Sequence, residues 1–570
     1  MPVVTIESLS FRYRSASGEA LRDINLAVDE GEFVVIMGPN EAGKSTLCLT
    51  LNGLIPHLIR GALSGRVKTC GIDTRDRPVK DLFPHVGLVL QDFEAQLFST
   101  EVELEVAFAP ENLGLPVEEI EQRIMRSLEL TGLHGLRGRQ PATLSGGQKQ
   151  LLAIASALSL EPRILCFDEP TTDLDPGNKR RIFSLARRLL EQRRQTLIMV
   201  EHETEEALSA DRIVLMRDGR IVGEGPPCEV LRNMSLLEQC RVMPLQVTEL
   251  FERLGTAELP LDLDEAKQIW RRDSFELLPG AAEKLMEADR QKAGRYGRGL
   301  VEVEDISFSY EGEIEALRGI SLKIREGEFI AVLGRNGSGK TTLAKHLNGL
   351  LRPTGGEVRV RGASTDQMSA AELGRQVGYV FQNPDHQIFE ETILDEVLFG
   401  PKKIGMDSDQ AREQARDALE TVGLWERRSE DPFMLTKGLR QKVAVASVLA
   451  TRPRAIVMDE PTTGLDHGEL KQMMSLINKL NEDGHTIVMI THCIWIAAQY
   501  AHRTILMSGG EVVADGPTRE VFAREDLLAK AGIIAPQIVR FANELGTTIL
   551  SVDEFLLCAQ RSTGNESVSV

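Results

Sequence analysis

"GPNEAGKS" at residues 38–45 and "GRNGSGKT" at residues 334–341 are two copies of one pattern, G-x-x-x-x-G-K-[ST], within a single chain. Each copy follows a short apolar run and precedes a stretch with helical periodicity. This context predicts a glycine-rich loop between a strand and a helix. The backbone N–H groups of such a loop, together with the helix N-terminus, bind phosphate groups. The sequence therefore predicts two phosphate-binding sites, and the recurrence makes a chance glycine-rich turn a poor explanation.

The side chains that close each loop predict a nucleotide with a metal ion. Lys44 or Lys340 is expected to reach the terminal phosphates, and the hydroxyl of Ser45 or Thr341 to hold Mg²⁺. The predicted ATP-binding residues of the first loop are Gly38, Pro39, Asn40, Glu41, Ala42, Gly43, Lys44, Ser45 and Thr46. Those of the second loop are Gly334, Arg335, Asn336, Gly337, Ser338, Gly339, Lys340, Thr341 and Thr342.

The two loops belong to a duplicated domain. Residues 20–54 align without gaps on residues 316–350 at an offset of 296, and later motifs repeat at an offset of 291. The difference fits the longer loop at residues 55–67 of the first copy. A period of this length is too long for a solenoid repeat, so two complete domains are expected.

Length and composition agree with two domains of a soluble globular class. The chain has 570 residues, which exceeds what one hydrophobic core usually holds. We expect domains at residues 1–280 and 300–570, joined by a charged linker at residues 281–299. The net charge of −19 argues against binding to nucleic acid, which needs clustered Lys and Arg.

Cysteine usage and hydropathy limit the remaining classes. The seven cysteines are scattered, odd in number and without a CxxC pair, so a disulfide framework or zinc site is not expected. The N-terminus has no apolar core of a secretory signal, and no run of about 18 apolar residues predicts a membrane span. A role at a membrane would therefore require a partner.

Each copy has the pattern of an α/β domain. Short apolar runs predict buried parallel strands at residues 33–38, 164–169 and 196–202. Helices are expected at residues 44–52 and 147–159, and a hairpin at residues 212–225 that turns at Asp218-Gly219.

Two adjacent acids end a strand in each copy, within "RILCFDEP" (163–170) and "RAIVMDEP" (454–461). Asp168 and Asp459 suit Mg²⁺ binding, whereas Glu169 and Glu460 are placed to orient or deprotonate a water molecule. Solvated acids at a strand end are the simpler explanation. The two acids recur at matching distances from the two phosphate loops, and this recurrence favours the catalytic interpretation.

A third motif is intact in the first copy and altered in the second. "TLSGGQKQLLAIAS" (143–156) matches "MLTKGLRQKVAVAS" (434–447) except at its centre. There Ser145, Gly146, Gly147 and Gln148 stand opposite Thr436, Lys437, Gly438 and Leu439.

Together the phosphate loops, "LSGGQ", "DEPTTDLD" and a strand-end histidine resemble the ATP-binding cassette (ABC) ATPases over nearly the whole chain. The resemblance implies two tandem P-loop cassettes, each with a RecA-like core, an antiparallel β subdomain, a helical subdomain and a short C-terminal helical extension. It implies that two cassettes pack head to tail around ATP within one chain, so that no homo-oligomer is required. Each ATP would lie between one P-loop and the LSGGQ segment of the other cassette (Ser145, Gly146, Gly147 and Gln148 in the intact copy).

The resemblance also assigns roles to single residues. Gln91 and Gln382 would lie near Mg²⁺ and the attacking water, completing a metal site predicted from Ser45, Gln91, Asp168, Thr341, Gln382 and Asp459. His202 and His492 would contact the γ-phosphate, and Tyr13 and Tyr310 would stack on adenine. A lone tyrosine or histidine is more often a core or surface residue, so the sequence alone leaves that alternative open.

Segments after the loop glutamines indicate which cassettes these are. "QDFEAQLFSTEVELEVAFAPENLGL" (91–115) and "QNPDHQIFEETILDEVLFGPKKIGM" (382–406) resemble the ATPases of energy-coupling factor (ECF) transporters and related cobalt and nickel importers. The segments at 243–255 and 535–546 resemble their C-terminal extensions. This implies partners in the membrane, a coupling subunit and a small substrate-binding subunit, with the chain at the cytoplasmic face. The cargo would be a vitamin, a vitamin precursor or a transition-metal ion.

Two other classes remain as alternatives. A twin-cassette sugar importer ATPase would share most of these motifs. A soluble ABC translation factor should carry a long basic helical linker, whereas residues 256–299 are mixed in charge and contain Pro260 and Pro279.

The mismatches between the copies predict unequal sites. If the cassettes pack head to tail, the first P-loop meets the altered motif with Lys437 and Leu439, and the same site carries Glu41 where the second copy has Gly337. The second P-loop meets the intact motif. We therefore expect the second site to perform most of the hydrolysis and the first mainly to hold ATP.

Overall fold

The computed structural model describes residues 1–172, 174–191, 195–310 and 314–561, so the end of the expected second domain, residues 562–570, lies outside the described residues. The described chain divides into two compact units, Met1–Leu245 and Gln246–Val570 as bounded by their contacts. Each unit contains one copy of the duplicated domain.

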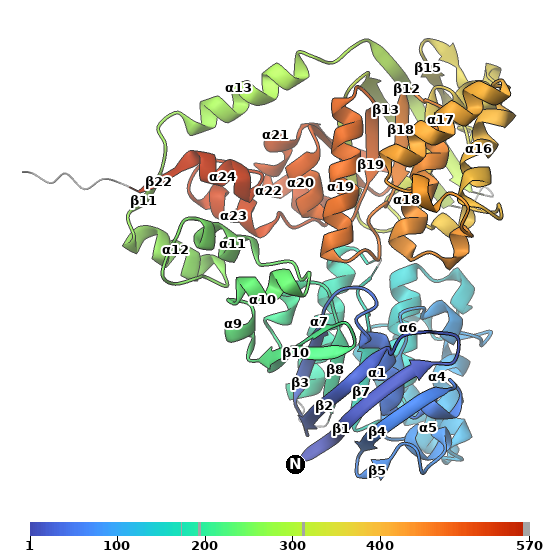
Figure 1. Ribbon diagram of the computed structural model, residues 1–570, viewed down its shortest axis with the longest axis vertical. Helices are drawn as coiled ribbons and strands as arrows, with labels where there is room; N and C mark the ends of the chain where they lie inside the picture. The colour runs from blue at the N-terminus through green and yellow to red at the C-terminus, as the bar shows by residue number, and fades with distance from the viewer. Residues whose placement is uncertain (173, 192–194, 311–313, 562–570) are drawn as a thin grey trace, which may run out of the picture. The chain divides into compact units, whose positions relative to one another are not determined.

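The first unit is built on two sheets (Figure 1). A six-stranded sheet has the order β10-β9-β3-β8-β7-β6, and all neighbours in it are parallel except β10. A four-stranded antiparallel sheet has the order β2-β1-β4-β5. The strands are β1 (Pro2–Tyr13), β2 (Leu21–Asp29), β3 (Phe33–Met37), β4 (Gly61–Thr69), β5 (Ile72–Asp73), β6 (Val86–Val89), β7 (Ile164–Asp168), β8 (Thr196–Val200), β9 (Arg212–Arg217) and β10 (Arg220–Gly225).

Helices surround these sheets, and three of them, α4, α5 and α6, form the helical subdomain. The α-helices of this unit are α1 (Lys44–Leu51), α2 (Leu54–His57), α3 (Val79–Leu82), α4 (Val102–Asn112), α5 (Val117–Thr131), α6 (Gly146–Leu158), α7 (Pro176–Glu191), α8 (Thr204–Ala207), α9 (Pro227–Val230) and α10 (Met234–Gln239). The expected strands, helices and hairpin are therefore confirmed. The hairpin turn has φ of 50° at Asp218 and 78° at Gly219, as a tight two-residue turn requires.

The second unit repeats this architecture. Its six-stranded sheet has the order β17-β18-β19-β14-β20-β21, and its antiparallel sheet β13-β12-β15-β16. Strands are β12 (Gly299–Tyr310), β13 (Ile314–Arg325), β14 (Phe329–Gly334), β15 (Gly355–Val360), β16 (Ala363–Ser364), β17 (Val377–Val380), β18 (Ala455–Asp459), β19 (Thr486–Ile490), β20 (Arg503–Ser508) and β21 (Glu511–Pro517). The cassette helices are α14 (Lys340–Leu347), α15 (Ala370–Gly374), α16 (Ile393–Lys403), α17 (Ser408–Thr421), α18 (Lys437–Leu449), α19 (His467–Glu482), α20 (Ile494–Tyr500), α21 (Thr518–Phe522) and α22 (Glu525–Lys530).

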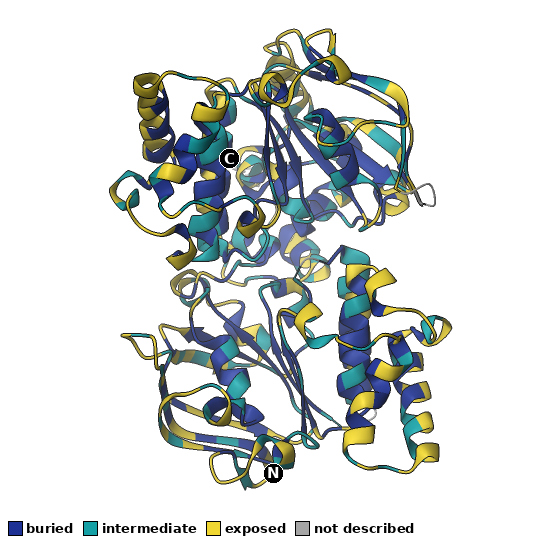
Figure 2. Cartoon of the chain, turned by 90° about the vertical axis from the view of Figure 1, so that its right-hand side faces the viewer, coloured by how far each residue is buried: buried dark blue, intermediate teal, exposed yellow. Residues whose placement is uncertain are grey.

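The central parallel strands of both sheets form the core of each unit. Every residue of β3, β7 and β8 is buried, as is every residue of β14, β18 and β19 (Figure 2). The antiparallel sheet and helices cover the faces of each parallel sheet and exclude water from it, which explains why these strands are continuous apolar runs. The loops at their carboxyl ends carry the predicted site.

The boundary between the units differs from the expected one. Residues 246–280 form α11 (Gln246–Arg253), α12 (Leu263–Arg272) and β11 (Phe275–Leu277), and they pack in the second unit. They contact α23 (Gln537–Glu544), α24 (Val552–Cys558) and β22 (Ala559–Arg561). Phe251 and Trp270 of α11 and α12 lie among Phe541 and Phe555, with ring centroids 5.5–5.9 Å apart across the two segments. The two extensions therefore bury each other's apolar faces, which no local pattern reveals.

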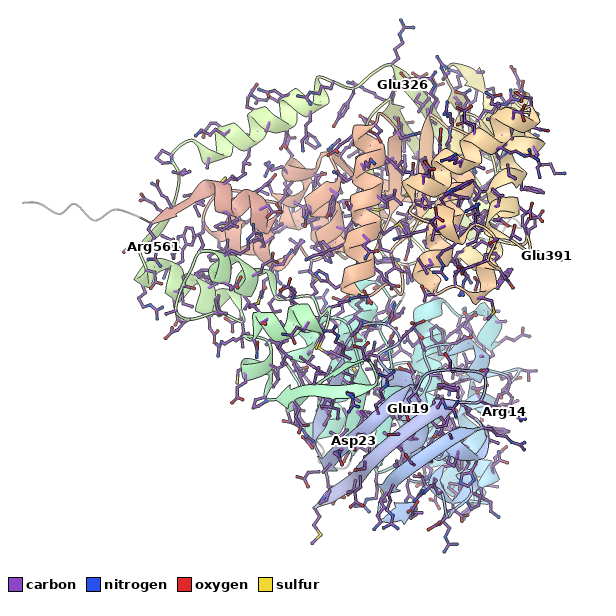
Figure 3. The ribbon with its side chains drawn as sticks, viewed as in Figure 1. Arg14, Glu19, Asp23, Glu326, Glu391 and Arg561 are labelled. Carbon is purple, nitrogen blue, oxygen red and sulfur yellow. The ribbon has the colours of Figure 1, made fainter. Side chains whose placement is uncertain are left out.

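The expected linker contains a helix. Within residues 281–299 the structure has α13 (Ala281–Ala293), of which only Ala281 is buried. Its Ala, Leu, Met, Glu and Lys residues have high helix propensity but no apolar stripe, so periodicity gave no helical signal. The strand β11, which precedes α13, pairs antiparallel with β22, whose last residue is Arg561 (labelled in Figure 3). The Arg561 guanidinium lies over the Phe275 ring, 5.1 Å from its centroid.

Candidate active sites in the two cassettes

Each phosphate loop connects the central strand β3 or β14 to the helix α1 or α14. The helix begins after Gly43 or Gly339, whose φ angles are 95° and 98°. A Cβ atom at Gly43 would lie 2.4 Å from the carbonyl oxygen of Ala20, so glycine is required there for both backbone conformation and space. The loop residues predicted from the sequence thus form the expected strand–loop–helix structure.

The loop lysines are held in place by backbone carbonyls. Lys44 Nζ donates to the carbonyls of Gly38 and Pro39 at 2.9 and 2.8 Å. Lys340 Nζ donates to Gly334 and Arg335, both at 2.9 Å. Each lysine is only 5% exposed, so its ammonium is anchored inside the loop where a phosphate can accept its protons.

The first loop has a glutamate at a position where both loops adopt a left-handed backbone conformation. Glu41 has φ of 62° and its counterpart Gly337 has φ of 76°. The position therefore favours glycine, and Glu41 adopts a left-handed conformation that costs about 1–2 kcal/mol for a residue with a side chain.

A hydroxyl and a carboxylate meet behind each loop. Ser45 Oγ donates to Asp168 Oδ1 at 3.0 Å, and Thr341 Oγ1 donates to Asp459 Oδ1 at 3.2 Å. Burial raises the pKa of both aspartates, and the charge of the neighbouring glutamate adds to this effect; the pKa of Asp168 is raised to about 6. A buried carboxylate with a raised pKa gains from a nearby cation.

These oxygens fit Mg²⁺. The ion prefers oxygen ligands and usually takes one or two carboxylates together with substrate phosphates and water. The described part of the chain contains no group of three or more His, Cys, Asp or Glu that would form an all-protein metal site. One hydroxyl and one carboxylate beside a phosphate loop are the set that Mg²⁺-ATP needs.

The strand-end glutamates pair with the predicted histidines. His202 Nε2 lies 2.9 Å from Glu169 Oε1, and His492 Nε2 lies 2.6 Å from Glu460 Oε1. Burial is the largest single effect and raises the pKa of each glutamate, but the hydrogen bond and charge attraction of the histidine, the charge of the loop lysine and the threonine hydrogen bond together outweigh it. The pKa of Glu169 falls to about 2, and that of Glu460 is also lowered. Both glutamates therefore carry a charge that can attract a water proton.

These glutamates also have an unusual backbone. Their φ angles are 50° and 49°, which is uncommon for residues with a side chain and frequent at functional sites. Thr172 and Thr463 each donate to the Oε2 atom of the glutamate three residues earlier at 3.2 Å. The sequence analysis did not single out these threonines; both belong to the repeated "DEPTT".

The loop glutamines differ between the cassettes. Gln91 Nε2 donates to Glu169 Oε2 at 2.6 Å. Gln382 is exposed and makes no such bond to Glu460 among the residues described. The first cassette therefore brings together Gln91, Glu169 and His202, whereas the second brings together only Glu460 and His492.

The predicted adenine-stacking tyrosines lie beside the phosphate loops. The hydroxyl of Tyr13 is 3.0 Å from Thr46 Oγ1, and that of Tyr310 is 3.3 Å from Thr342 Oγ1. Tyr310 is 42% exposed, so its ring is open to a ligand. Stacking on adenine stays a prediction.

The third motif caps a helix in both cassettes. The Ser145 side chain accepts from Gln148 N, and Gln148 Oε1 accepts from Ser145 N, which completes a capping box at α6. In the altered copy Thr436 Oγ1 accepts from Leu439 N at 3.4 Å, but leucine cannot return the bond. A Cβ atom at Gly464 would lie 2.8 Å from Lys437 Nζ, so the lysine ammonium occupies the space beside the "TTGLD" loop.

A further site residue, Tyr379, was not predicted from the sequence. Tyr379 donates its hydroxyl to Asp459 Oδ2 at 3.0 Å. Leu88 stands at the equivalent place in the first copy, so a comparison of "VGLV" (86–89) with "VGYV" (377–380) could have found it.

Two P-loop cassettes, each with a buried lysine, a hydroxyl–carboxylate pair and a glutamate–histidine pair, define a nucleotide triphosphatase. A family profile described as "ABC transporter" matches residues 21–172 and 317–463. A *Caldanaerobacter subterraneus* protein named as an ABC transporter ATP-binding protein is 49% identical over 562 residues, covering 98% of this chain and 99% of its own. A similarly named *Methanosarcina mazei* protein is 39% identical over 557 residues, covering 95% of this chain and 94% of its own.

Among solved structures, cbiO1 from *Clostridium perfringens*, described as part of the ABC transporter complex cbiONQ, is 32% identical. It covers 41% of this chain and 94% of its own, with a TM-score of 0.38. The family profile and the relatives show that the chain belongs to the ATP-binding cassette family of transport ATPases. It is an ATP-binding ATPase with two cassettes in one chain, and none of its described helices has the length and hydropathy to cross a bilayer.

Proposed function

We propose that this chain is the fused, two-cassette ATPase of an ECF-type importer. It would work at the cytoplasmic face of the membrane and drive uptake of a vitamin, a vitamin precursor or a transition-metal ion. Its partners would be an integral membrane coupling subunit and a small membrane subunit that binds the cargo. The observation that carries this proposal is an aromatic pair with an exposed phenylalanine at the same place in both cassettes.

The aromatic pairs follow the loop glutamines. The rings of Phe98 and Phe108 lie edge to face with centroids 4.6 Å apart, and those of Phe389 and Phe399 with centroids 4.7 Å apart. Phe98 is 62% exposed and Phe389 is 57% exposed. Large apolar side chains left exposed in pairs are typical of a surface that another protein covers.

Buried glutamates hold these aromatic residues in place. Glu105 Oε2 accepts from the backbone N–H groups of Phe98 and Ser99 at 3.1 and 2.9 Å. Glu396 Oε2 accepts in the same way from Phe389 and Glu390 at 2.9 and 3.0 Å. Both glutamates are at most 3% exposed, so each exposed phenylalanine projects from a rigid turn rather than from a loose loop.

We infer that segments 92–103 and 383–394 receive helices of the membrane partner. Among the apolar residues of these two segments, Phe93, Leu97 and Phe98 are exposed or partly exposed, as is Phe389. Ile388 is only 3% exposed and belongs to the core, so we do not include it in the surface that meets the partner.

At the nucleotide, the chain's own residues position the attacking water and stabilise the charge of the phosphates. Lys44 or Lys340 balances phosphate charge, while Glu169 or Glu460 orients or deprotonates the attacking water. Mg²⁺, when held by Ser45 and Asp168 or by Thr341 and Asp459 with Gln91 or Gln382 nearby, would neutralise the developing charge. Closure on two ATP molecules and reopening after hydrolysis would move the membrane partner.

The partner class distinguishes this proposal from its alternatives. Purification of the tagged chain from detergent-solubilised native membranes should yield a stoichiometric integral membrane subunit and a second, small membrane protein that binds cargo. Two membrane subunits accompanied by a soluble sugar-binding protein would instead identify a sugar importer. Sedimentation with ribosomes, and none with membranes, would identify a translation factor.

The aromatic pairs can be tested separately from the ATPase. Substitution of Phe98 and Phe389 by glutamate should abolish transport while basal ATP hydrolysis stays within about twofold, because the rings are exposed and distant in sequence from the phosphate loops. The exposed Leu58→Glu variant is a matched control, since it also removes a large exposed apolar side chain (69% exposed). Transport that survives both phenylalanine substitutions would contradict the coupling role.

A further inference from the structure

Tyr379 lies on β17, three residues before Gln382, and is 7% exposed. Its hydroxyl donates to Asp459 Oδ2 at 3.0 Å, while Thr341 Oγ1 donates to Asp459 Oδ1 at 3.2 Å. Each carboxylate oxygen of Asp459 therefore has its own hydroxyl donor. The second cassette fixes the plane of this carboxylate from two sides.

Among its described residues, the first cassette lacks the second hydroxyl donor to its aspartate. Leu88 occupies the equivalent position on β6, between Gly87 and Val89. Asp168 Oδ1 accepts from Ser45 Oγ at 3.0 Å, and no second side-chain hydrogen bond to Asp168 occurs in the described part of the chain. One aspartate is held by two hydroxyls and the other by one.

We propose that Tyr379 is a positioning residue that orients Asp459 for Mg²⁺ in the second site. The terminal torsion of an aspartate is broad, so a carboxylate with one hydrogen bond can rotate, whereas one with two cannot do so without breaking a bond. Hydrogen-bond partners of metal ligands set the orientation and basicity of those ligands. This inference rests on the proposed role of Asp459 as a Mg²⁺ ligand.

Packing alone does not account for a tyrosine here. The ring lies edge to face on Phe381 with centroids 5.0 Å apart and belongs to a core cluster with Val377 and Val457. Phenylalanine would make the same ring contacts. Only the hydroxyl requires tyrosine, and its partner is Asp459.

Binding of a non-hydrolysable ATP analogue, measured by calorimetry in Mg²⁺ and again in EDTA, tests the proposal. A Lys44→Ala background restricts binding to the second P-loop. Tyr379→Phe should weaken binding in Mg²⁺ about fivefold, which corresponds to about 1 kcal/mol for one hydrogen bond, and leave binding in EDTA unchanged. Bound Mn²⁺, followed by electron paramagnetic resonance, should show the same loss without any turnover.

Two control variants separate the explanations. Phe381→Leu removes the ring that packs on Tyr379 but keeps the hydroxyl, so the ratio of affinities in Mg²⁺ and EDTA should stay at the wild-type value. An equal change in Phe381→Leu, or none in Tyr379→Phe, would overturn the positioning role. Asp459→Asn should lose the Mg²⁺ dependence. If Asp459→Asn loses the Mg²⁺ dependence and Tyr379→Phe binds like wild type, only the positioning role of Tyr379 is refuted. If Asp459→Asn keeps the Mg²⁺ dependence, the proposed metal site itself is refuted.

Discussion

Glu41 and Lys437 are the residues that most distinguish the two cassettes at their nucleotide motifs. Glu41 is held at φ 62°, where the second loop has a glycine. Lys437 replaces a glycine of the intact "SGGQ", and its ammonium lies beside Gly464 within its own cassette. If ATP is sandwiched between one P-loop and the other cassette's motif, both departures fall in the first site. The second P-loop would meet the intact motif.

Two matched substitutions test this inequality. Glu460→Gln should reduce ATP hydrolysis to a few per cent or less of wild type, because general-base or water-positioning groups contribute about 10²–10⁴-fold. Glu169→Gln should leave at least about half of the activity, since the first site is expected mainly to hold ATP. Steady-state phosphate release measures both.

The two variants control for each other, because both glutamates are buried beside a histidine and each keeps its size as glutamine. Equal losses from the two substitutions would refute the unequal sites. A larger loss from Glu169→Gln would reverse the assignment.

At this scale most residues of the candidate site could be predicted from the sequence. Lys44, Asp168, Glu169 and their counterparts were recognisable because phosphate and metal chemistry demands particular residues at fixed spacing from a strand end. The pairing of His202 with Glu169 and the hydroxyl of Tyr379 on Asp459 were not, because each joins residues from different strands. Their spacing in the chain carries no signal of contact.

At the scale of elements, the two C-terminal extensions exchange hydrogen bonds. Val247 N donates to Gln537 Oε1 at 3.2 Å, and Ile538 N donates to Gln246 Oε1 at 3.1 Å. Each glutamine begins a helix and accepts from the first turn of the other helix, so α11 and α23 cap each other. The same pseudo-symmetry appears in the aromatic cluster and in the pair β11–β22.

Removal of one cap should loosen α11. Gln537 is 4% exposed, and it also donates to the carbonyl of Leu261 at 3.2 Å. Gln537→Ala leaves buried Val247 N–H and Leu261 C=O without these partners, so the local opening free energy should fall by about 1–3 kcal/mol. Hydrogen exchange of peptides covering residues 246–253 measures this change.

Gln268→Ala is the matched control, because Gln268 is an exposed glutamine on the neighbouring helix α12. Its exchange should resemble wild type. Equal acceleration in both variants, or none in Gln537→Ala, would show that the reciprocal caps do not hold the extensions together.

At the scale of the whole molecule, both cassettes are on one chain, so we expect a complete pair of ATP sites to form without a second copy. We expect the purified chain of 63.0 kDa to remain a monomer with ATP and Mg²⁺ under conditions where Glu460→Gln prevents turnover. Multi-angle light scattering measures the mass. An obligate particle of two chains, with cross-links joining a P-loop of one to the "LSGGQ" motif of another, would contradict this expectation.

The sequence by itself determined the family, the duplication and the order of elements. The local geometry of the phosphate loop requires Gly43 and Lys44, and burial requires the apolar runs of β3, β7 and β8. Both requirements act on residues that are neighbours in the chain, so they can be recognised in the sequence. The inequality of the two "SGGQ" copies is also a property of the letters alone.

Only the tertiary structure decided which unit holds residues 246–280, that α13 is a helix, and which side chains hold Asp459 and Glu169. The reason is physical: an amphipathic extension must bury its one apolar face, but its sequence pattern does not show which other segment that face packs against. Likewise, the sequence alone indicates only that Tyr379 is a core residue, because the carboxylate that accepts from its hydroxyl comes from a different strand. Contacts between segments far apart in the chain are formed by tertiary packing, and local sequence patterns do not reveal which segments pack together.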